Sequence, residues 1–143
     1  MINTSASEKV YKNALDSLYD GVAIFDSDGN PVYVNQAHLS QIGINMDTWY
    51  ATNLRDSPTL SLTISGSPIS LSVLEEKKAH SGLAHYIKTE KTCLVSSSLV
   101  YTEGNKFLIV SVVRDLTELL ELQQKVRTLD VLKDTYARKL REF

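Results

Sequence analysis

Phe107-Leu-Ile-Val-Ser-Val-Val113, followed directly by Arg114-Asp-Leu-Thr-Glu118, is the stretch that decides how this chain is organised. Its first half is rich in β-branched residues and has no helical period, which predicts a buried strand. In its second half, Asp115 and Glu118 have the spacing of a capping box, which predicts that a helix begins at Asp115. Because no glycine- or serine-rich linker intervenes, we expect a rigid junction made by Arg114, Asp115, Thr117 and Glu118.

Beyond this junction, apolar residues recur in alternating steps of three and four, which is the heptad spacing of a coiled coil. Lys133 is the one polar member of the series. The spacing predicts a homodimer formed through Leu119, Leu122, Val126, Leu129, Tyr136, Leu140 and Phe143. Two alternatives remain: a single amphipathic helix folded back on its own domain, or, because Leu132 and Ala137 widen the stripe, partial packing on the globular part or in a four-helix contact. Because the seam is unfinished at Phe143, we expect the chain to be a piece of a longer protein.

Size and composition limit the class of protein. The chain has 143 residues and 43% hydrophobic content, which suits one small core with extensions. We expect an N-terminal amphipathic helix over 1–18, a core over 19–114 and a signalling helix over 115–143. A net charge of −2 without a basic stripe argues against direct nucleic-acid binding. The single cysteine indicates a cytoplasmic setting, and no apolar run approaches a membrane span or a signal peptide.

The first third of the chain predicts a helix, a hairpin and a second short helix. Ser5 or Ser7 can cap the first helix, which should end near Asp20-Gly21 and whose apolar face could cover the sheet or meet a second copy. Two β-rich runs, 22–26 and 31–34, flank an Asp-Gly turn and predict a hairpin. Asn35 then caps a helix over 36–42 that Gly43 ends.

The rest of the core is less regular. Residues 44–66 predict a variable crossover over the sheet, with a short helix that Asp47 caps and Trp49 anchors, and with a strand-like alternation over 60–64. Ser67-Pro68 opens a helix expected to reach His80, with Gly82 as its stop. Strands follow over 83–88, 92–101 and 107–114. This order predicts an α+β fold in which short helices cover one face of a five-stranded antiparallel sheet.

The segments Leu18-Tyr-Asp-Gly-Val-Ala-Ile-Phe-Asp-Ser-Asp-Gly-Asn-Pro-Val-Tyr-Val-Asn35 and Arg114-Asp-Leu-Thr-Glu118 resemble the PAS domain family. The first is similar to the family's opening hairpin, and the second to its closing Asp-x-Thr motif before a signalling helix. The resemblance implies the PAS fold and a sensory or dimerising module that relays a small-molecule or conformational signal to an effector.

The tail, with Thr135-Tyr-Ala-Arg-Lys-Leu140, more particularly resembles the linker between the PAS and AAA+ domains of bacterial sigma-54-dependent transcription activators. This implies an effector that regulates transcription. The alternatives are a ligand-free structural dimerisation domain and the PAS input domain of a sensor kinase.

A PAS core implies a pocket between sheet and helices in which small polar strand residues can hold a ligand. Serines interrupt the apolar strands at 96–98 and 111, and Cys93 lies near them. The ligand-binding candidates are Tyr86, Ser96, Ser98, Ser111 and, as a minor contributor, Asn35. Because strand parity alone does not say which side is inside, the serines could instead face outward or bond to the neighbouring strand.

The sequence gives little indication of a bound metal, haem or flavin, or of catalysis. His38, His80 and His85 fall on different predicted elements without the paired spacing of metal ligands. Haem-binding PAS proteins carry their histidine inside the helix that here covers about 68–79, which has none. Flavin-binding relatives place a reactive cysteine on a helix, whereas Cys93 sits in a predicted strand. Because the sequence shows no nucleophilic side chain paired with a general base, we expect no enzymatic activity.

Overall fold

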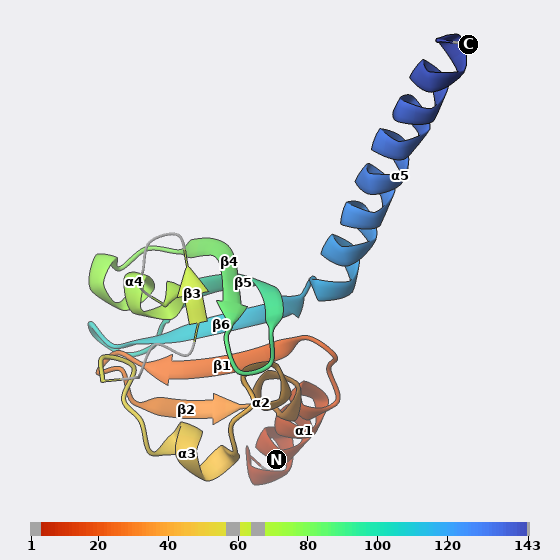
Figure 1. Cartoon of the computed structure of the whole chain (residues 1–143). Coiled ribbons are helices and arrows are strands. Elements are labelled where there is room, and N and C mark those ends of the chain that lie inside the picture. Colours follow the sequence, from red (N-terminus) through yellow and green to blue (C-terminus); the bar gives the residue numbers. More distant parts are fainter. Residues whose placement is uncertain (1–3, 57–60, 64–67, 143) are drawn as a thin grey trace.

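The computed structural model describes residues 4–56, 61–63 and 68–142 (Figure 1). A twisted antiparallel sheet carries helices on one face, and a long helix leaves it at the C-terminal end. The helices are α1 (Thr4–Asp16), α2 (Gln36–Ile42), α3 (Met46–Tyr50), α4 (Ile69–Glu76) and α5 (Thr117–Arg141). The strands are β1 (Gly21–Asp26), β2 (Pro31–Val34), β3 (Ser61–Thr63), β4 (His80–Tyr86), β5 (Lys91–Tyr101) and β6 (Phe107–Asp115).

The predicted α+β architecture is confirmed, with one addition to the sheet. Within the described residues the strand order is β2-β1-β6-β5-β4-β3, so the five expected strands are joined by the three-residue β3 at the edge beside β4. Of the predicted alternation over 60–64, Ser61–Thr63 form β3, and Leu60 and Ile64 lie outside the described residues. The first and last strands along the chain, β1 and β6, are neighbours in the sheet and pair from Gly21↔Val113 to Asp26↔Leu108.

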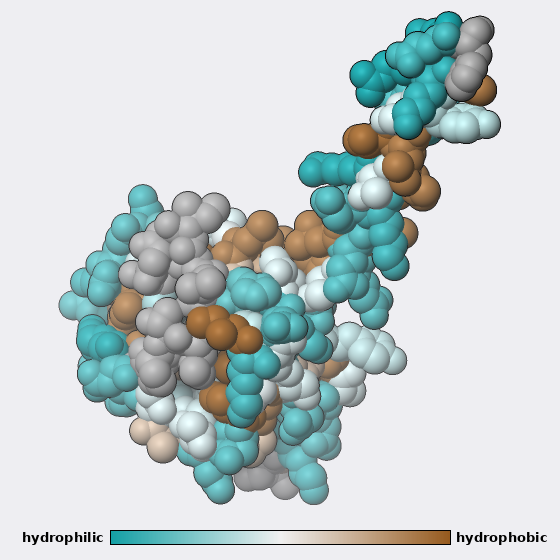
Figure 2. Space-filling model, viewed as in Figure 1, coloured by the Kyte–Doolittle hydropathy of each residue, from teal (hydrophilic) through white to brown (hydrophobic). Residues whose placement is uncertain are grey.

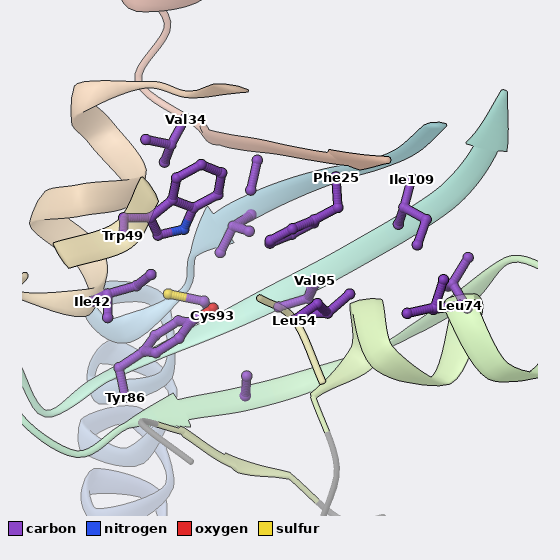
Figure 3. Packing of buried hydrophobic residues seen from close by; sticks show 14 of the residues in the cluster. Phe25, Val34, Ile42, Trp49, Leu54, Leu74, Tyr86, Cys93, Val95 and Ile109 are labelled. Carbon is purple, nitrogen blue, oxygen red and sulfur yellow. The ribbon is translucent and has the colours of Figure 1, made fainter. Parts of the chain in front are cut away.

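The core lies between the sheet and helices α2, α3 and α4 (Figure 3). Alternate residues of β5 and β6 turn inward because successive side chains of a strand point to opposite faces. Trp49 from α3 packs on Phe25 of β1, with ring centroids 5.3 Å apart. The fully buried members of this core are Val34, Val73, Cys93, Ile109 and Val113.

The β1–β2 hairpin and α2 follow the sequence prediction. Asp26 Oδ1 accepts hydrogen bonds from the backbone N–H groups of Asp28 and Asn30, and Gly29 takes a φ of 83° that favours glycine. Asn35 caps α2, and Gly43 ends it in the left-handed region with a φ of 82°. These local signals suffice because each turn is closed by its own side chains.

Several predicted boundaries are wrong where tertiary contacts intervene. Helix α4 ends at Glu76, not at His80, because Lys77 adopts a left-handed conformation and bonds back to Val73. Strand β4 therefore begins at His80, opposite Ser97 of the long β5, and Gly82 lies inside it. A Cβ at Gly82 would come within 3.1 Å of Ile69, so this glycine permits close approach of α4. Pro68 is the N-cap residue of α4, and Ser67 lies outside the described residues.

Two further helix ends differ from the prediction. Asn45, not Asp47, caps α3, because its side chain accepts the Thr48 N–H and leaves Asp47 in the first turn. Helix α1 ends at Asp16, before the expected Asp20-Gly21, and Leu18 is exposed. Its apolar residues Val10 and Tyr11 are also exposed, so α1 does not cover the sheet with that face.

Helix α5 begins two residues later than predicted and leaves the body of the molecule (Figure 1). The capping box is wrong: Asp115 is the last residue of β6, Leu116 is the N-cap, and Glu118 lies in the first turn without a capping bond. Asp115 Oδ1 instead accepts the Thr117 N–H at 2.9 Å. The helix spans about 38 Å at 1.5 Å per residue, and none of its described residues is buried.

Candidate functional site

A cavity of about 130 Å³ lies between the inner face of the sheet and the helices that cover it. It exists because small residues stand side by side on the central strands, where Ala23 of β1 pairs with Ser111 of β6. The surrounding wall is largely apolar. The residues that line it are Ala23, Phe25, His38, Ile42, Ile44, Thr48, Trp49, Thr52, Leu54, Pro68, Ile69, Ser70, Ala84, Tyr86, Val95, Ser111 and Val113.

Three buried serines form a hydroxyl cluster at the cavity wall. Ser111 Oγ lies 2.6 Å from Ser97 Oγ and 2.7 Å from Ser70 Oγ, whereas Ser70 and Ser97 are 3.4 Å apart. They come from β6, β5 and α4, and Ser70 and Ser111 line the cavity itself. Each hydroxyl therefore has a hydrogen-bonding partner, which offsets the cost of burying it among apolar residues.

Two of the β5 serines proposed as ligand-binding candidates, Ser96 and Ser98, lie on the wrong face of the sheet for that role. Ser96 and Ser98 are exposed on the outer face of the sheet, and Ser97 between them faces inward at 2% exposure. The β5–β6 register decides this, because it places Ser97 opposite the inward Ser111. Ser96 and Ser98 therefore cannot reach a molecule inside the cavity, whereas the candidate Ser111 lies on its wall.

A second polar group, His38 of α2, lies on the cavity wall. Its Nδ1 is 3.1 Å from Gln41 Oε1, and Gln41 Nε2 donates to the Val113 carbonyl at 3.0 Å. Burial lowers the pKa of His38 to about 4, although the hydrogen bond with Gln41 acts in the opposite direction. His38 is therefore neutral near pH 7, and its hydrogen bonds through Gln41 connect the cavity to Val113 near the end of β6.

Tyr86 lines the cavity beside His38, as a ligand-binding candidate would. The two rings meet edge to face with centroids 6.0 Å apart. Burial raises the pKa of the Tyr86 hydroxyl, so the ring stays uncharged. Burial also raises the pKa of Cys93 to about 11, which keeps this thiol protonated and unreactive.

Asn35 has a structural role that fills its hydrogen-bonding capacity. Its Oδ1 accepts the backbone N–H groups of Val22 and His38, and its Nδ2 donates to the carbonyls of Leu15 and Asp20. An asparagine side chain offers two donors and two acceptor lone pairs. The expectation of a minor ligand contact is therefore corrected: Asn35 joins α1, β1 and α2.

The junction residues hold the start of α5 against β5. Thr117 Oγ1 accepts the Thr92 N–H at 3.0 Å, and the Leu116 N–H donates to the Thr92 carbonyl at 2.8 Å. Burial raises the pKa of Asp115, but hydrogen bonds from Thr117 and the ion pair with Lys91 outweigh it and lower the pKa. Arg114 makes an ion pair with Asp20 at 3.1 Å, whereas Glu118 is exposed.

The seam residues of α5 are open to solvent in the single chain (Figure 2). Their exposed fractions lie between 50% and 67% for Leu119, Leu122, Val126, Leu129, Tyr136 and Leu140. Phe143 lies outside the described residues. The alternative of a helix folded back on its own domain is therefore wrong.

The histidine, cysteine and carboxylate side chains of the described ranges do not gather at one metal-ligating position. No group of three His, Cys, Asp or Glu residues there could hold a metal ion, and His38, His80 and His85 lie on α2 and at two places along β4. Among the described helices, none combines the length and the apolar character needed to cross a membrane.

Comparison with solved structures gives matches to PAS domains that cover most of this chain. A PAS domain of a two-component sensor histidine kinase is 15% identical and has a TM-score of 0.56, covering 79% of this chain and 99% of that one. The PAS domain of BvgS from Bordetella pertussis is 14% identical with a TM-score of 0.56, covering 87% of this chain and 97% of that one.

This chain has the fold of a PAS domain. A third example, the PAS domain of nitrogen regulation protein NR(II) from Vibrio parahaemolyticus, is 10% identical with a TM-score of 0.55 and covers 74% of this chain and 97% of that one. No protein-family model and no curated protein matches the sequence. At identities of 10–15% these proteins share the PAS fold with this chain, and the fold alone does not specify which molecule the cavity binds.

Sequence reasoning missed three polar residues of the site: His38, Gln41 and Ser70. His38 and Gln41 are polar residues on the buried side of α2, beside the apolar Leu39 and Ile42. A polar residue beside an apolar stripe gives no signal of burial by itself. Ser70 lies among apolar residues at the start of α4, and only the packing of α4 on the sheet brings it to Ser111.

Proposed function

We propose that the chain is a PAS sensory and dimerisation module that binds a small molecule in its cavity and relays the occupied state through α5 to an effector that regulates transcription. One observation carries this proposal: β6 supplies part of the cavity wall and continues into α5 with a single intervening residue, Leu116. A change at the cavity wall therefore acts on β6, and through Leu116 on α5, the helix that leaves the domain.

The first step of the relay is contact between the cavity and β6. Ser111 and Val113 of β6 line the cavity, and Gln41 links the wall residue His38 to the Val113 carbonyl. A ligand shifts a conformational equilibrium only by the difference in its affinity for the two states. A ligand that moves His38 or Ser111 changes contacts of β6 directly, which supplies such a difference.

The second step is transfer from β6 to α5. Thr92 of β5 bonds to both Leu116 and Thr117, and Asp115 bonds to Thr117 and Lys91. These bonds restrain the direction in which α5 leaves the sheet. A twist of the sheet therefore changes the helix direction, and a helix about 38 Å long enlarges the displacement at its far end.

The third step is pairing of two copies through α5. The exposed seam has apolar residues at the two core positions of a heptad, which is the pattern that buries itself against a second helix. The exposed Val10 and Tyr11 of α1 offer a second apolar surface for the same pair. The signal junction and the homodimer interface are parts of this proposal.

The effector is proposed from the resemblance of the tail to sigma-54-dependent activators. A sensor kinase is the second candidate, because structures of similar fold come from a two-component sensor histidine kinase and from BvgS. A ligand-free dimerisation domain is less consistent with a cavity of about 130 Å³. A non-catalytic role fits the cavity wall, since its described residues include no acidic side chain or cysteine beside His38.

Native mass spectrometry of the protein purified from cells tests the sensory function. We expect a reproducible bound molecule, and we expect Ala84→Phe to lose it because Ala84 lines the cavity. Leu83→Phe is the matched control, since this neighbouring residue is 42% exposed. Circular dichroism checks that both variants fold. A wild-type protein that is always empty, with α5 pairing unaffected by cell extracts, would contradict the proposal.

A further inference from the structure

The charge of the cavity wall limits what it can hold. No described lining residue carries a formal charge near pH 7: the wall has serine, threonine and tyrosine hydroxyls, and His38 is neutral because burial lowers its pKa to about 4. A buried ionised group without a counter-charge loses more solvation than neutral hydrogen bonds return. The wall therefore discriminates against anions and cations alike.

The serine cluster has one O–H group that is only weakly engaged. Three hydroxyls supply three donors, but only two short contacts exist, both to Ser111. When Ser97 donates to Ser111 and Ser111 donates to Ser70, the Ser70 proton is left with no short contact inside the cluster, since Ser70 and Ser97 are 3.4 Å apart. Because Ser70 lines the cavity, this hydroxyl can bond with a molecule inside it.

His38 supplies an acceptor on the same wall. Gln41 uses its amide N–H on the Val113 carbonyl, so its Oε1 faces His38 and accepts from Nδ1. A neutral imidazole protonated on Nδ1 has an unprotonated Nε2. Among the described residues, no hydrogen bond to this Nε2 is present. The site thus offers a hydroxyl and a nitrogen acceptor within an apolar enclosure.

We propose that the cavity binds an uncharged, largely apolar molecule of about one ring in size, held by a hydroxyl group that bonds with the Ser70–Ser97–Ser111 cluster, with His38 as a further acceptor on the same wall. This inference rests on the proposed sensory function and adds the chemical class of the ligand. A cavity of roughly 150 Å³ in another protein accommodates benzene, which supports the size.

Four compounds of nearly equal size test the class: benzyl alcohol, toluene, benzoate and benzylamine. Isothermal titration calorimetry at pH 7.5 should show that benzyl alcohol binds roughly five- to tenfold more tightly than toluene, which is the effect of one net hydrogen bond. Benzoate and benzylamine, both ionised at this pH, should bind at least about a hundredfold more weakly. Equal binding of toluene, or tighter binding of either ion, overturns the inference.

Variants locate the hydrogen bond. Ser70→Ala and Ser111→Ala should reduce benzyl alcohol binding to the level of toluene while toluene binding is retained, which also shows that the variants are folded. Ser98→Ala is the matched control, because this serine is exposed on the opposite face of β5, and it should change neither affinity. Equal losses for both compounds in the variants overturn the assignment to the cluster.

The sensory function and the ligand class can be contradicted separately. If none of the four compounds binds, the proposed ligand class is wrong, whatever native mass spectrometry finds. If mass spectrometry finds a retained molecule that is charged, the sensory function stands and the ligand class does not.

Discussion

At the scale of single residues, two buried polar side chains organise the interior. Asn35 makes four hydrogen bonds that join the end of α1, the start of β1 and the first turn of α2. His38 stands beside the cavity and reaches β6 through Gln41. One residue therefore serves the fold and the other the site, although both are polar residues in the same short segment.

Asn35→Ala should strongly destabilise the domain. It removes the hydrogen bonds that the side chain makes with two backbone N–H groups and two carbonyls, and we expect a loss of about 2–4 kcal/mol in the free energy of unfolding. Asn45→Ala is the matched control: Asn45 also caps a helix, but it is exposed and accepts only the Thr48 N–H, so a loss of about 1 kcal/mol is expected. Urea denaturation measures both, and similar losses would contradict this account.

His38 should make stability depend on pH. Its pKa falls to about 4 in the folded state, while an unfolded histidine titrates near 6.5, so the unfolded chain binds more protons between these values. Stability from this group is present above pH 6.5 and is lost as the pH falls towards 4, by about 2–3 kcal/mol between pH 7 and 4.5.

Urea denaturation at pH 7 and 4.5 checks this, with His38→Gln as the comparison because glutamine can bond to Gln41 without titrating. The variant should lose less stability than the wild type over the same interval. An identical loss in both proteins would show that other groups control the acid sensitivity.

At the scale of elements, local sequence patterns identified most strands and helices, while neighbours set their ends. The turn at Gly29 and the cap at Asn35 close within a few residues, and both were predictable. The end of α4 was not, because β5 extends far enough to pair with His80 and draws that residue into β4. The start of α5 shifted for a similar reason, since Asp115 continues the β6 ladder opposite Cys93.

Helix α5 should control assembly. Leu122→Asp combined with Leu129→Asp places two charges in the proposed seam and should make the protein monomeric in sedimentation equilibrium, because buried unpaired charges oppose helix pairing. Gln124→Asp combined with Val131→Asp is the matched control, with the same seven-residue spacing on the opposite side of the helix. A dimer that persists in the first variant would move the interface to α1 or the sheet.

At the scale of the whole molecule, the chain separates into a packed body and a projecting rod (Figure 1). The body holds the core and the cavity, whereas the rod has no buried residue among those described. This arrangement is consistent with a domain that folds by itself and uses α5 for assembly. It also explains why the cavity and the seam can be tested independently.

A chain shortened to residues 1–123 should fold without dimerising. Residues beyond the first turns of α5 add no buried contact to the body, while Leu116 and Thr117 keep their bonds to Thr92. We expect the free energy of unfolding to match that of the monomeric full-length variant within about 1 kcal/mol, as measured by urea denaturation. Loss of folding in the short chain would show that α5 is part of the cooperative unit.

The sequence by itself determined most of the order of elements, the hairpin, the Asn35 cap and the heptad spacing of apolar residues over the last helix, because each depends on residues that are close along the chain. Only the tertiary structure decided the inward direction of Ser97, the meeting of Ser70 with Ser111, and the burial of His38. These depend on strand register and helix packing between segments up to 72 residues apart, as in the bond from Gln41 to Val113. No local pattern encodes such contacts, since a single residue of register reverses which face of a strand is buried.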